Sequence, residues 1–501
     1  MKTNLFKRIL AGLLSALMLG SMAACAGGGE TAETTTPVDT TPAETEPVET
    51  EPTVDEWGRD IVKDDLPADL RFDGETLTFL TRNEKNCYYE FYTAESTGDI
   101  VGDSILSRNM RVEDRLGVKI EIVERPGSWD KKDEFASFVT TSFMAGDNSF
   151  DVVAAYAAYS NMQTLTDCYY NLADLPNVNY EKPWWNQSYI NAATIHDQFF
   201  TVLSDLNLLA IDRAVGIWFN RDLAEEYQLG NLYEVALNGQ WTIDKMLEIT
   251  RGLAHDLNGN NTFDDADFYA ITGTKGSTSF DPFFPAFNIW YTSIDSEGDL
   301  TYTLDVDRAT SAIDLARSLF YDDNRSMLAN ERQKFSSGEA MFWITWLWNI
   351  TGSRDMDDEY GLLPLPKYDE NQENYYTTSQ DSYNTMGVMR DAKNLEMIGA
   401  ALELLSAETW RTVRPQYFEN SFKMRYMRDS ESGQIFDIVV DGIVYEHAIL
   451  HNQSLSGMGT MHRAELNENR NRLASALRSK EKTFEKNLEM LNGYFIDRGN
   501  E

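Results

Sequence analysis

Short stretches in which apolar and polar residues alternate predict the β-strands in the first half of the chain. The clearest are 76–80 (TLTFL) and 118–122 (VKIEI), because the side chains of a strand point alternately to opposite faces. The run 150–155 (FDVVAA) is more continuously apolar and predicts a strand that is buried on both faces. Between these strands, apolar residues recur at helical spacing. We expect the first helix to have Asp103 as its N-cap and Gly117 at its C-terminus.

The order strand, helix, strand, helix, strand predicts an α/β fold with a parallel sheet and right-handed crossovers. Ligands of such open sheets bind beyond the carboxyl ends of the strands. We therefore expect residues 81–83 and 156–160, which follow the first and third strands, to lie near any binding site.

The second half of the chain alternates between apolar strands and amphipathic helices. Its expected elements are a strand at 199–205, a strand near 215–219, a helix capped by Thr242, a helix around 313–320, a strand at 361–366, a helix capped by Asn394, and charged helical sequence from about 466 to 495. The chain is long enough, at 501 residues, for two or three packed lobes.

The N-terminal residues predict export. Residues 1–24 contain Lys2, Lys7 and Arg8, then an uncharged apolar run and small residues, which is the pattern of a signal peptide. The ending Met22-Ala23-Ala24-Cys25 resembles a bacterial lipobox, which implies that Cys25 is lipidated and becomes the first mature residue. A lone cysteine after a leader can be accidental. Here, residues 26–56 continue as Thr, Pro and Glu without Lys or Arg, which predicts a disordered tether for a folded domain at 57–501.

The charge and the cysteines narrow the possible partners. The formal net charge of −38 disfavours nucleic acid and anionic lipid headgroups. It suits a solvated extracellular surface or an uncharged or cationic ligand. With Cys25 acylated, Cys87 and Cys168 remain and could form one disulfide outside the membrane, although the sequence does not say whether they lie within reach.

Four stretches resemble family 1 extracellular solute-binding proteins, the maltose-binding-like group of ABC importers. They are, in the order of that family, Phe219-Asn220-Arg221-Asp222-Leu223, Phe335–Met341 followed by Trp346 and Trp348, Gly361–Pro366, and Asn384–Val388. The resemblance implies two α/β lobes joined by a hinge, with a ligand cleft between them. Lobe 1 would comprise about 72–206 and 384–425, and lobe 2 about 208–382 and 426–501. It also implies a lipid-anchored monomer on the outer face of a bacterial membrane that delivers a small solute to an ABC permease.

Aromatic residues are the candidate ligand contacts, because rings stack on the flat C–H faces of sugars. The candidates are Trp184, Trp185, Trp290, Trp346 and Trp348, with Asp205 as a hydrogen-bonding partner at the end of a strand. Each ring could instead belong to the core, and Asp205 could be a turn cap. The spacing between Gly338 and the tryptophan pair differs by one residue from the family pattern, so either Trp346 or Trp348 could face the ligand.

Residues 256–267 (DLNGNNTFDDAD) form a candidate calcium loop. Oxygen-bearing side chains fall at Asp256, Asn258, Asn260, Asp264 and Asp267, and Thr262 can offer its carbonyl, which is the rhythm that Ca²⁺ prefers. The pattern resembles EF-hand or dockerin loops, with Asn261 in place of the usual glycine and Asp267 in place of the usual glutamate. The alternative is a polar turn between a helix and a strand.

The sequence gives little support for a catalytic function. His447 and His451 have the i,i+4 spacing of a zinc helix, but Ala448 stands where a zinc protease needs glutamate. The sequence also lacks a Gly-x-Ser-x-Gly elbow. We therefore expect a non-enzymatic binding protein for a solute, with an oligosaccharide favoured over a peptide or another polar solute. The rival readings are a cell-surface glycan-acting enzyme and a surface scaffold held by its calcium loop.

Overall fold

The computed structural model describes residues 54–84, 87, 89–423, 427 and 429–499. The chain divides into two compact units, residues 1–61 and 62–501. In the first, the described part is a short turn in which Val54 bridges to Asp60 and Arg59 pairs with Asp55. The expected signal peptide, Cys25 and nearly all of the expected tether lie outside the described residues.

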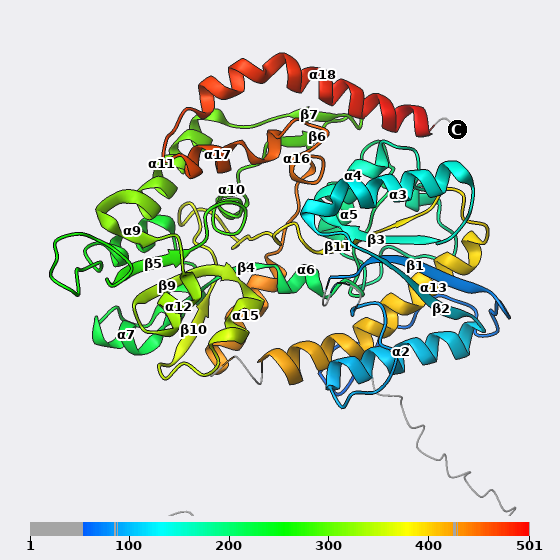
Figure 1. Cartoon of the computed structure of the whole chain (residues 1–501), viewed down its shortest axis with the longest axis horizontal. Helices are drawn as coiled ribbons and strands as arrows, with labels where there is room; N and C mark the ends of the chain where they lie inside the picture. Colours follow the sequence, from blue (N-terminus) through cyan, green and yellow to red (C-terminus); the bar gives the residue numbers. More distant parts are fainter. Residues whose placement is uncertain (1–53, 85–86, 88, 424–426, 428, 500–501) are drawn as a thin grey trace, which may run out of the picture. The chain divides into compact units, whose positions relative to one another are not determined.

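Lobe 1 is built on a four-stranded sheet of order β11-β3-β1-β2 (Figure 1). Its strands are β1 (Thr76–Arg82), β2 (Lys119–Arg125), β3 (Val152–Tyr156) and β11 (Asn384–Val388). β1 pairs in parallel with both β2 and β3, which confirms the expected parallel arrangement. β11 returns from far along the chain and pairs antiparallel with β3, with Asn384 opposite Tyr156.

Helices cover the sheet of lobe 1. They are α2 (Ile100–Leu116), α3 (Lys132–Ala145), α4 (Ala157–Thr164), α5 (Gln187–Ala193), α13 (Leu395–Glu408) and the short η1 (Trp129–Lys131), η2 (Leu172–Asp174), η5 (Thr409–Val413) and η6 (Gln416–Lys423). Gly117 ends α2 at a φ of 68°, and Asn394 caps α13, both as expected. The N-cap of α2 is Asp99 and not Asp103, because Asp99 lies just before the helix and accepts the N–H of Gly102.

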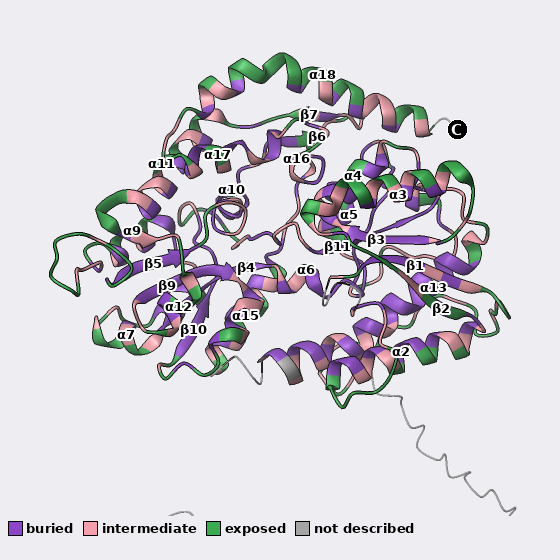
Figure 2. Cartoon of the chain, viewed as in Figure 1, coloured by how far each residue is buried: buried purple, intermediate pink, exposed green. Residues whose placement is uncertain are grey.

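Lobe 2 has a five-stranded mixed sheet of order β10-β4-β9-β5-β8. Its strands are β4 (Val215–Asn220), β5 (Tyr269–Gly273), β8 (Ser326–Met327), β9 (Ala340–Trp346) and β10 (Tyr360–Leu363), and a separate hairpin pairs β6 (Thr292–Ile294) with β7 (Leu300–Tyr302). Every residue of β4, β5 and β10 is buried, so the core of the lobe runs through this sheet (Figure 2).

Many short helices surround the sheet of lobe 2. They are α7 (Arg221–Glu226), α8 (Leu232–Leu237), α9 (Ile243–Thr250), α10 (Phe283–Ala286), α11 (Val306–Tyr321), α12 (Glu331–Ser336), α15 (Ser430–Asp441), α16 (His447–Leu450), α17 (Met461–Asn467), and η3 (Asp322–Asn324), η4 (Leu347–Ser353) and η7 (Met458–Thr460). No helix in the described part of the chain is long and apolar enough to cross a bilayer.

Two chain segments cross between the lobes side by side. The first contains α6 (Leu209–Asp212) and leads into β4, and the second leads from lobe 2 back into β11. Ala214 bridges antiparallel to Ser379, Gln380 N–H donates to the Arg213 carbonyl at 2.9 Å, and Val215 N–H donates to the Thr378 carbonyl at 3.2 Å. The crossings therefore form a short two-stranded hinge.

The last helix, α18 (Leu473–Gly499), contacts both lobes (Figure 1). Its first part packs on α11, α17 and β7, and Asn492 bonds to both backbone groups of Leu300 in lobe 2. Its last turns reach lobe 1, where Phe495 packs on Phe200 at 5.3 Å between ring centroids and Arg498 pairs with Asp167. α18 thus adds a connection between the lobes that is separate from the hinge.

Cys87 and Cys168 are both buried and unpaired in the structure. Burial raises the pKa of each thiol. The disulfide that the sequence left open is therefore not formed between them.

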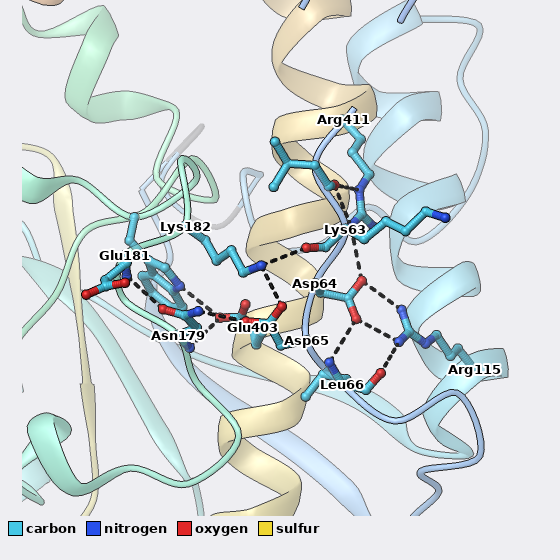
Figure 3. Close-up of polar contacts among 12 residues, drawn as sticks. Lys63, Asp64, Asp65, Leu66, Arg115, Asn179, Glu181, Lys182, Glu403 and Arg411 are labelled. Carbon is cyan, nitrogen blue, oxygen red and sulfur yellow. Dashed lines mark hydrogen bonds and ion pairs between the residues drawn. The ribbon is translucent and has the colours of Figure 1, made fainter. Parts of the chain in front are cut away.

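The start of the second unit is held on lobe 1 by ion pairs (Figure 3). Asp64 accepts from Arg115 at 2.7 Å and from Arg411 at 3.1 Å, and Asp65 pairs with Lys182 at 2.6 Å. Burial alone would raise the pKa of Asp64, but the two guanidinium groups outweigh it and lower that pKa to about 2. Asp64 and Asp65, at the start of the second unit, are therefore held on lobe 1 electrostatically.

Replacing Asp64 by asparagine should destabilise this attachment. A carboxyl pKa lowered from 3.8 to about 2 stabilises the fold by about 2 kcal/mol at pH 7. This contribution is present above about pH 4 and is lost as the pH falls through about 2. Urea unfolding at pH 7 should therefore show the loss in Asp64→Asn. Asp69→Asn, at an exposed aspartate of the same segment, is the matched control and should change stability little. Equal stability of the two variants would contradict the assignment.

Candidate functional site

The carboxyl ends of the parallel strands bring aromatic and cationic side chains together. Arg82 is the last residue of β1, Tyr156 is the last of β3, and Trp129 follows β2 at the start of η1. The rings of Trp129 and Tyr156 lie 6.0 Å apart, and the Arg82 guanidinium lies over the Tyr156 ring at 4.8 Å. Arg82 and Tyr156, which belong to the expected ranges 81–83 and 156–160, therefore lie at the carboxyl edge of the parallel strands.

The hinge places a second arginine beside the first. Arg82 donates to the Ser382 carbonyl at 2.7 Å and to Asn384 Oδ1 at 2.8 Å. Arg213 donates to Ser382 Oγ at 3.0 Å, and its guanidinium lies over the Trp346 ring at 4.6 Å. Trp346 is half-buried at the end of β9, so lobe 2 also contributes a ring to this group.

A carboxylate completes the group. Tyr156 Oη donates to Asp381 Oδ1 at 3.4 Å, and Gln380 Nε2 donates to the same oxygen at 2.6 Å. Burial raises the pKa of Asp381 to about 6, and the charge of Asp281 adds to this effect. Asp281 itself forms a two-point ion pair with Arg463.

We call Arg82, Trp129, Tyr156, Arg213, Trp346 and Asp381 the interlobe cluster. Its rings offer stacking surfaces, and its guanidinium and carboxyl groups can donate to and accept from hydroxyl groups. This combination suits a polar, uncharged ligand with apolar faces.

The structure separates the sequence-predicted tryptophans. Trp346 belongs to the interlobe cluster, whereas Trp348 stacks on Tyr417 at 6.2 Å between centroids and on Phe422. Trp290 is half-buried and lines a cavity that has no interlobe-cluster residue in its lining.

Two predicted contacts are corrected. Trp184 and Trp185 are 1% and 3% exposed in the core of lobe 1, where Trp185 Nε1 donates to Glu403 at 2.9 Å. Rings packed this deeply cannot stack on a ligand without rearrangement. Asp205 forms an ion pair with Arg414 at 3.1 Å, and its role as a ligand contact stays a prediction.

Sequence reasoning did not single out Trp129, Arg213 or Asp381. Arg213 and Asp381 flank the paired hinge crossings, and Trp129 lies beyond the end of β2. The alternation at 118–122 was the available signal for Trp129, because it marked a strand end next to it.

The 256–267 loop folds around its own polar side chains. The Asp256 carboxylate accepts the N–H groups of Gly259 and Asn261, each at 2.6 Å. Asn258 and Asn260 each accept from the residue two positions later. Asn261 adopts a φ of 60°, as its position in the loop required. Among the described residues, no three His, Cys, Asp or Glu side chains are grouped closely enough to hold a metal ion.

Comparison with known proteins gives structural likeness only. No protein-family model and no curated protein matches the chain. The sugar-binding protein MalE from Xanthomonas citri aligns with a TM-score of 0.57 and 11% identity, over 84% of this chain and 99% of MalE.

Two further solved structures agree with this. The galacto-N-biose/lacto-N-biose I-binding protein of a Bifidobacterium longum ABC transporter, in complex with lacto-N-biose, aligns at a TM-score of 0.53 and 10% identity, over 83% of this chain and 98% of its own. An ABC substrate-binding protein from Listeria monocytogenes, in complex with cycloalternan, aligns with a TM-score of 0.52 and 11% identity, over 83% of this chain and 100% of its own. The chain therefore has the fold of these binding proteins.

Proposed function

We propose that this protein is the extracellular substrate-binding component of a bacterial ABC importer and that it captures an oligosaccharide at the interlobe cluster. The observation that carries the proposal is the position of the cluster. Trp129 and Tyr156 of lobe 1 and Trp346 of lobe 2 lie at strand ends on either side of the hinge. Solved structures with this fold include the sugar-binding protein MalE and two ABC binding proteins in complex with cycloalternan and with lacto-N-biose.

The proposed mechanism is binding and closure without reaction. The three rings would stack on the C–H faces of the sugar, and the arginines and Asp381 would bond to its hydroxyl groups. The two hinge crossings would allow the lobes to close around the ligand. The closed, loaded form would then dock on the membrane permease. If no sugar binds, the alternative ligand is a peptide or another polar solute.

Replacing Trp346 by alanine should weaken oligosaccharide binding about tenfold, because a ring contact is worth about 1–2 kcal/mol. The measurement is thermal melting of residues 26–501 against a panel of oligosaccharides, since a ligand of the folded state raises the melting temperature. Trp348→Phe, outside the cluster, is the control and should bind as the parent does. A sugar that stabilises the parent and Trp346→Ala equally would exclude this ring from the site.

We propose that Cys25 anchors the protein to the outer face of the membrane and that 26–56 is its tether. The support is the resemblance of residues 22–25 to a lipobox and the Thr/Pro/Glu sequence that follows.

Cys25→Ala should move the protein from the membrane fraction to the medium or the soluble fraction of the producing bacterium. Fractionation and immunoblotting would measure this, with the tether variant Thr35→Ala as the control. Retention of Cys25→Ala in washed membranes would rule out the lipid anchor at this residue.

We also propose that the 256–267 loop binds a structural Ca²⁺. Three of the six predicted ligands, Asp256, Asp264 and Asp267, bring charge, so the site would also rely on the amide oxygens of Asn258 and Asn260 and on the Thr262 carbonyl. The support is the spacing of the oxygen-bearing residues in the sequence.

Calcium should raise the melting temperature of the metal-stripped protein, because it would bind the folded loop and not the unfolded chain. Asp256→Ala should abolish this shift. Asp265→Ala should keep it, because the Asp265 carboxylate bonds to Asn330. Identical melting with calcium and after exhaustive chelation would disprove the site.

A further inference from the structure

A cavity of about 740 Å³ lies apart from the interlobe cluster. Ser188 and Asn191 of α5 line it from lobe 1, and Trp290, Arg308, Tyr376 and His447 line it from lobe 2. The elements around it are in contact, because α16 packs on both α5 and β6 (Figure 1). Its volume falls within the range of small-molecule sites, which is about 300–1,000 Å³.

Two aromatic rings form one corner of this cavity. Trp290 and Tyr376 are both half-buried, with ring centroids 6.4 Å apart and planes at 68°. Trp290 Nε1 donates to Asn288 Oδ1 at 2.7 Å, which fixes the orientation of the indole. The corner therefore offers two preset faces for stacking.

Polar groups beside the rings are open to a ligand. Asn191 of α5 offers an exposed amide, and Ser293 and Thr303 add exposed hydroxyl groups to the lining of the cavity. Amide and hydroxyl groups both donate and accept, so they can bond to the hydroxyl groups of a ligand.

The charges at the cavity are already engaged within the protein. The Arg308 guanidinium lies over the Tyr368 ring at 4.1 Å and donates to the Phe287 carbonyl at 3.0 Å. Asp305 caps α11 by accepting the Arg308 N–H. The Glu446 carboxylate accepts the N–H groups of Tyr291 and Thr292. The cavity therefore suits an uncharged ligand.

We propose that this cavity is a second saccharide site, separate from the interlobe cluster, and that it takes a mono- or disaccharide stacked on Trp290 and Tyr376. The proposal rests on the proposed function only for the chemical class of the ligand. Both lobes line the cavity, and two of its lining residues are bonded to each other, because Ser188 Oγ accepts the Tyr445 N–H at 3.3 Å. A bound sugar would therefore contact both lobes at a point other than the cluster.

The test is ¹⁹F NMR of protein labelled with 5-fluorotryptophan, in which the 11 tryptophans report separately. Trp290→Phe and Trp346→Phe assign the two resonances. The probes are glucose, galactose, mannose, xylose, N-acetylglucosamine, maltose and lactose, up to about 20 mM to cover weak binding. At least one probe should shift the Trp290 resonance saturably, and should still do so in Trp346→Ala.

Variants on α5 test the lobe 1 wall. Asn191→Ala should raise the concentration needed for half of the Trp290 shift about threefold or more, because it removes one hydrogen bond to the ligand. Asn238→Ala, an exposed asparagine that follows α8 and lies away from the cavity, should leave it unchanged.

Each outcome distinguishes the two sites. A fixed Trp290 resonance with every probe would overturn the second site, whether or not the Trp346 resonance moves. Movement of Trp346 alone would leave the proposed function standing. Movement of Trp290 alone would support the second site and count against oligosaccharide capture at the cluster.

Discussion

The pairing of the two hinge crossings is the constraint on which the candidate site depends. Backbone bonds from Gln380 to Arg213 and from Val215 to Thr378 hold the outgoing and returning segments together. Arg213 and Asp381 therefore emerge next to one another although they are far apart in the chain. The return also supplies β11, which extends the sheet of lobe 1 beside β3. Each lobe is thus completed by a segment that has passed through the hinge.

The contacts of α18 add a second constraint. The helix is bonded to lobe 2 through Asn492 and packed on lobe 1 through Phe495. Any rotation of the lobes must keep these contacts as a pivot or break them. Because buried apolar contacts cost free energy to separate, the Phe495 contact opposes movement of lobe 1 away from α18.

Most local elements were predictable because their signals are local. The expected strand at 199–205 was wrong, because this stretch forms only isolated bridges, such as that of Val202 to Met386. Gly117 and Asn394 end and begin helices as expected, since capping depends on a few neighbouring residues. The expected Asp103 cap was wrong because Asp103 lies within the first turn of α2, whereas Asp99 lies just before the helix and accepts the Gly102 N–H. The parallel order of β1, β2 and β3 followed from the alternation of strands and helices.

The site was less predictable because it is assembled from distant segments. Trp184 and Trp185 have the composition of a sugar platform, yet contacts with Glu403 and Trp410 place them in the core. Trp346 was found through resemblance, and its choice over Trp348 needed the position of Arg213.

The most direct test of oligosaccharide capture is affinity retrieval from a mixture. Immobilised residues 26–501 would be exposed to oligosaccharides from partly hydrolysed glycans, washed and unfolded, and the released sugars identified by mass spectrometry. The account predicts one class of oligosaccharide, retained chemically intact and reduced when Trp346→Ala protein is used. Retention no greater than on Trp346→Ala, or release of shortened products, would contradict it.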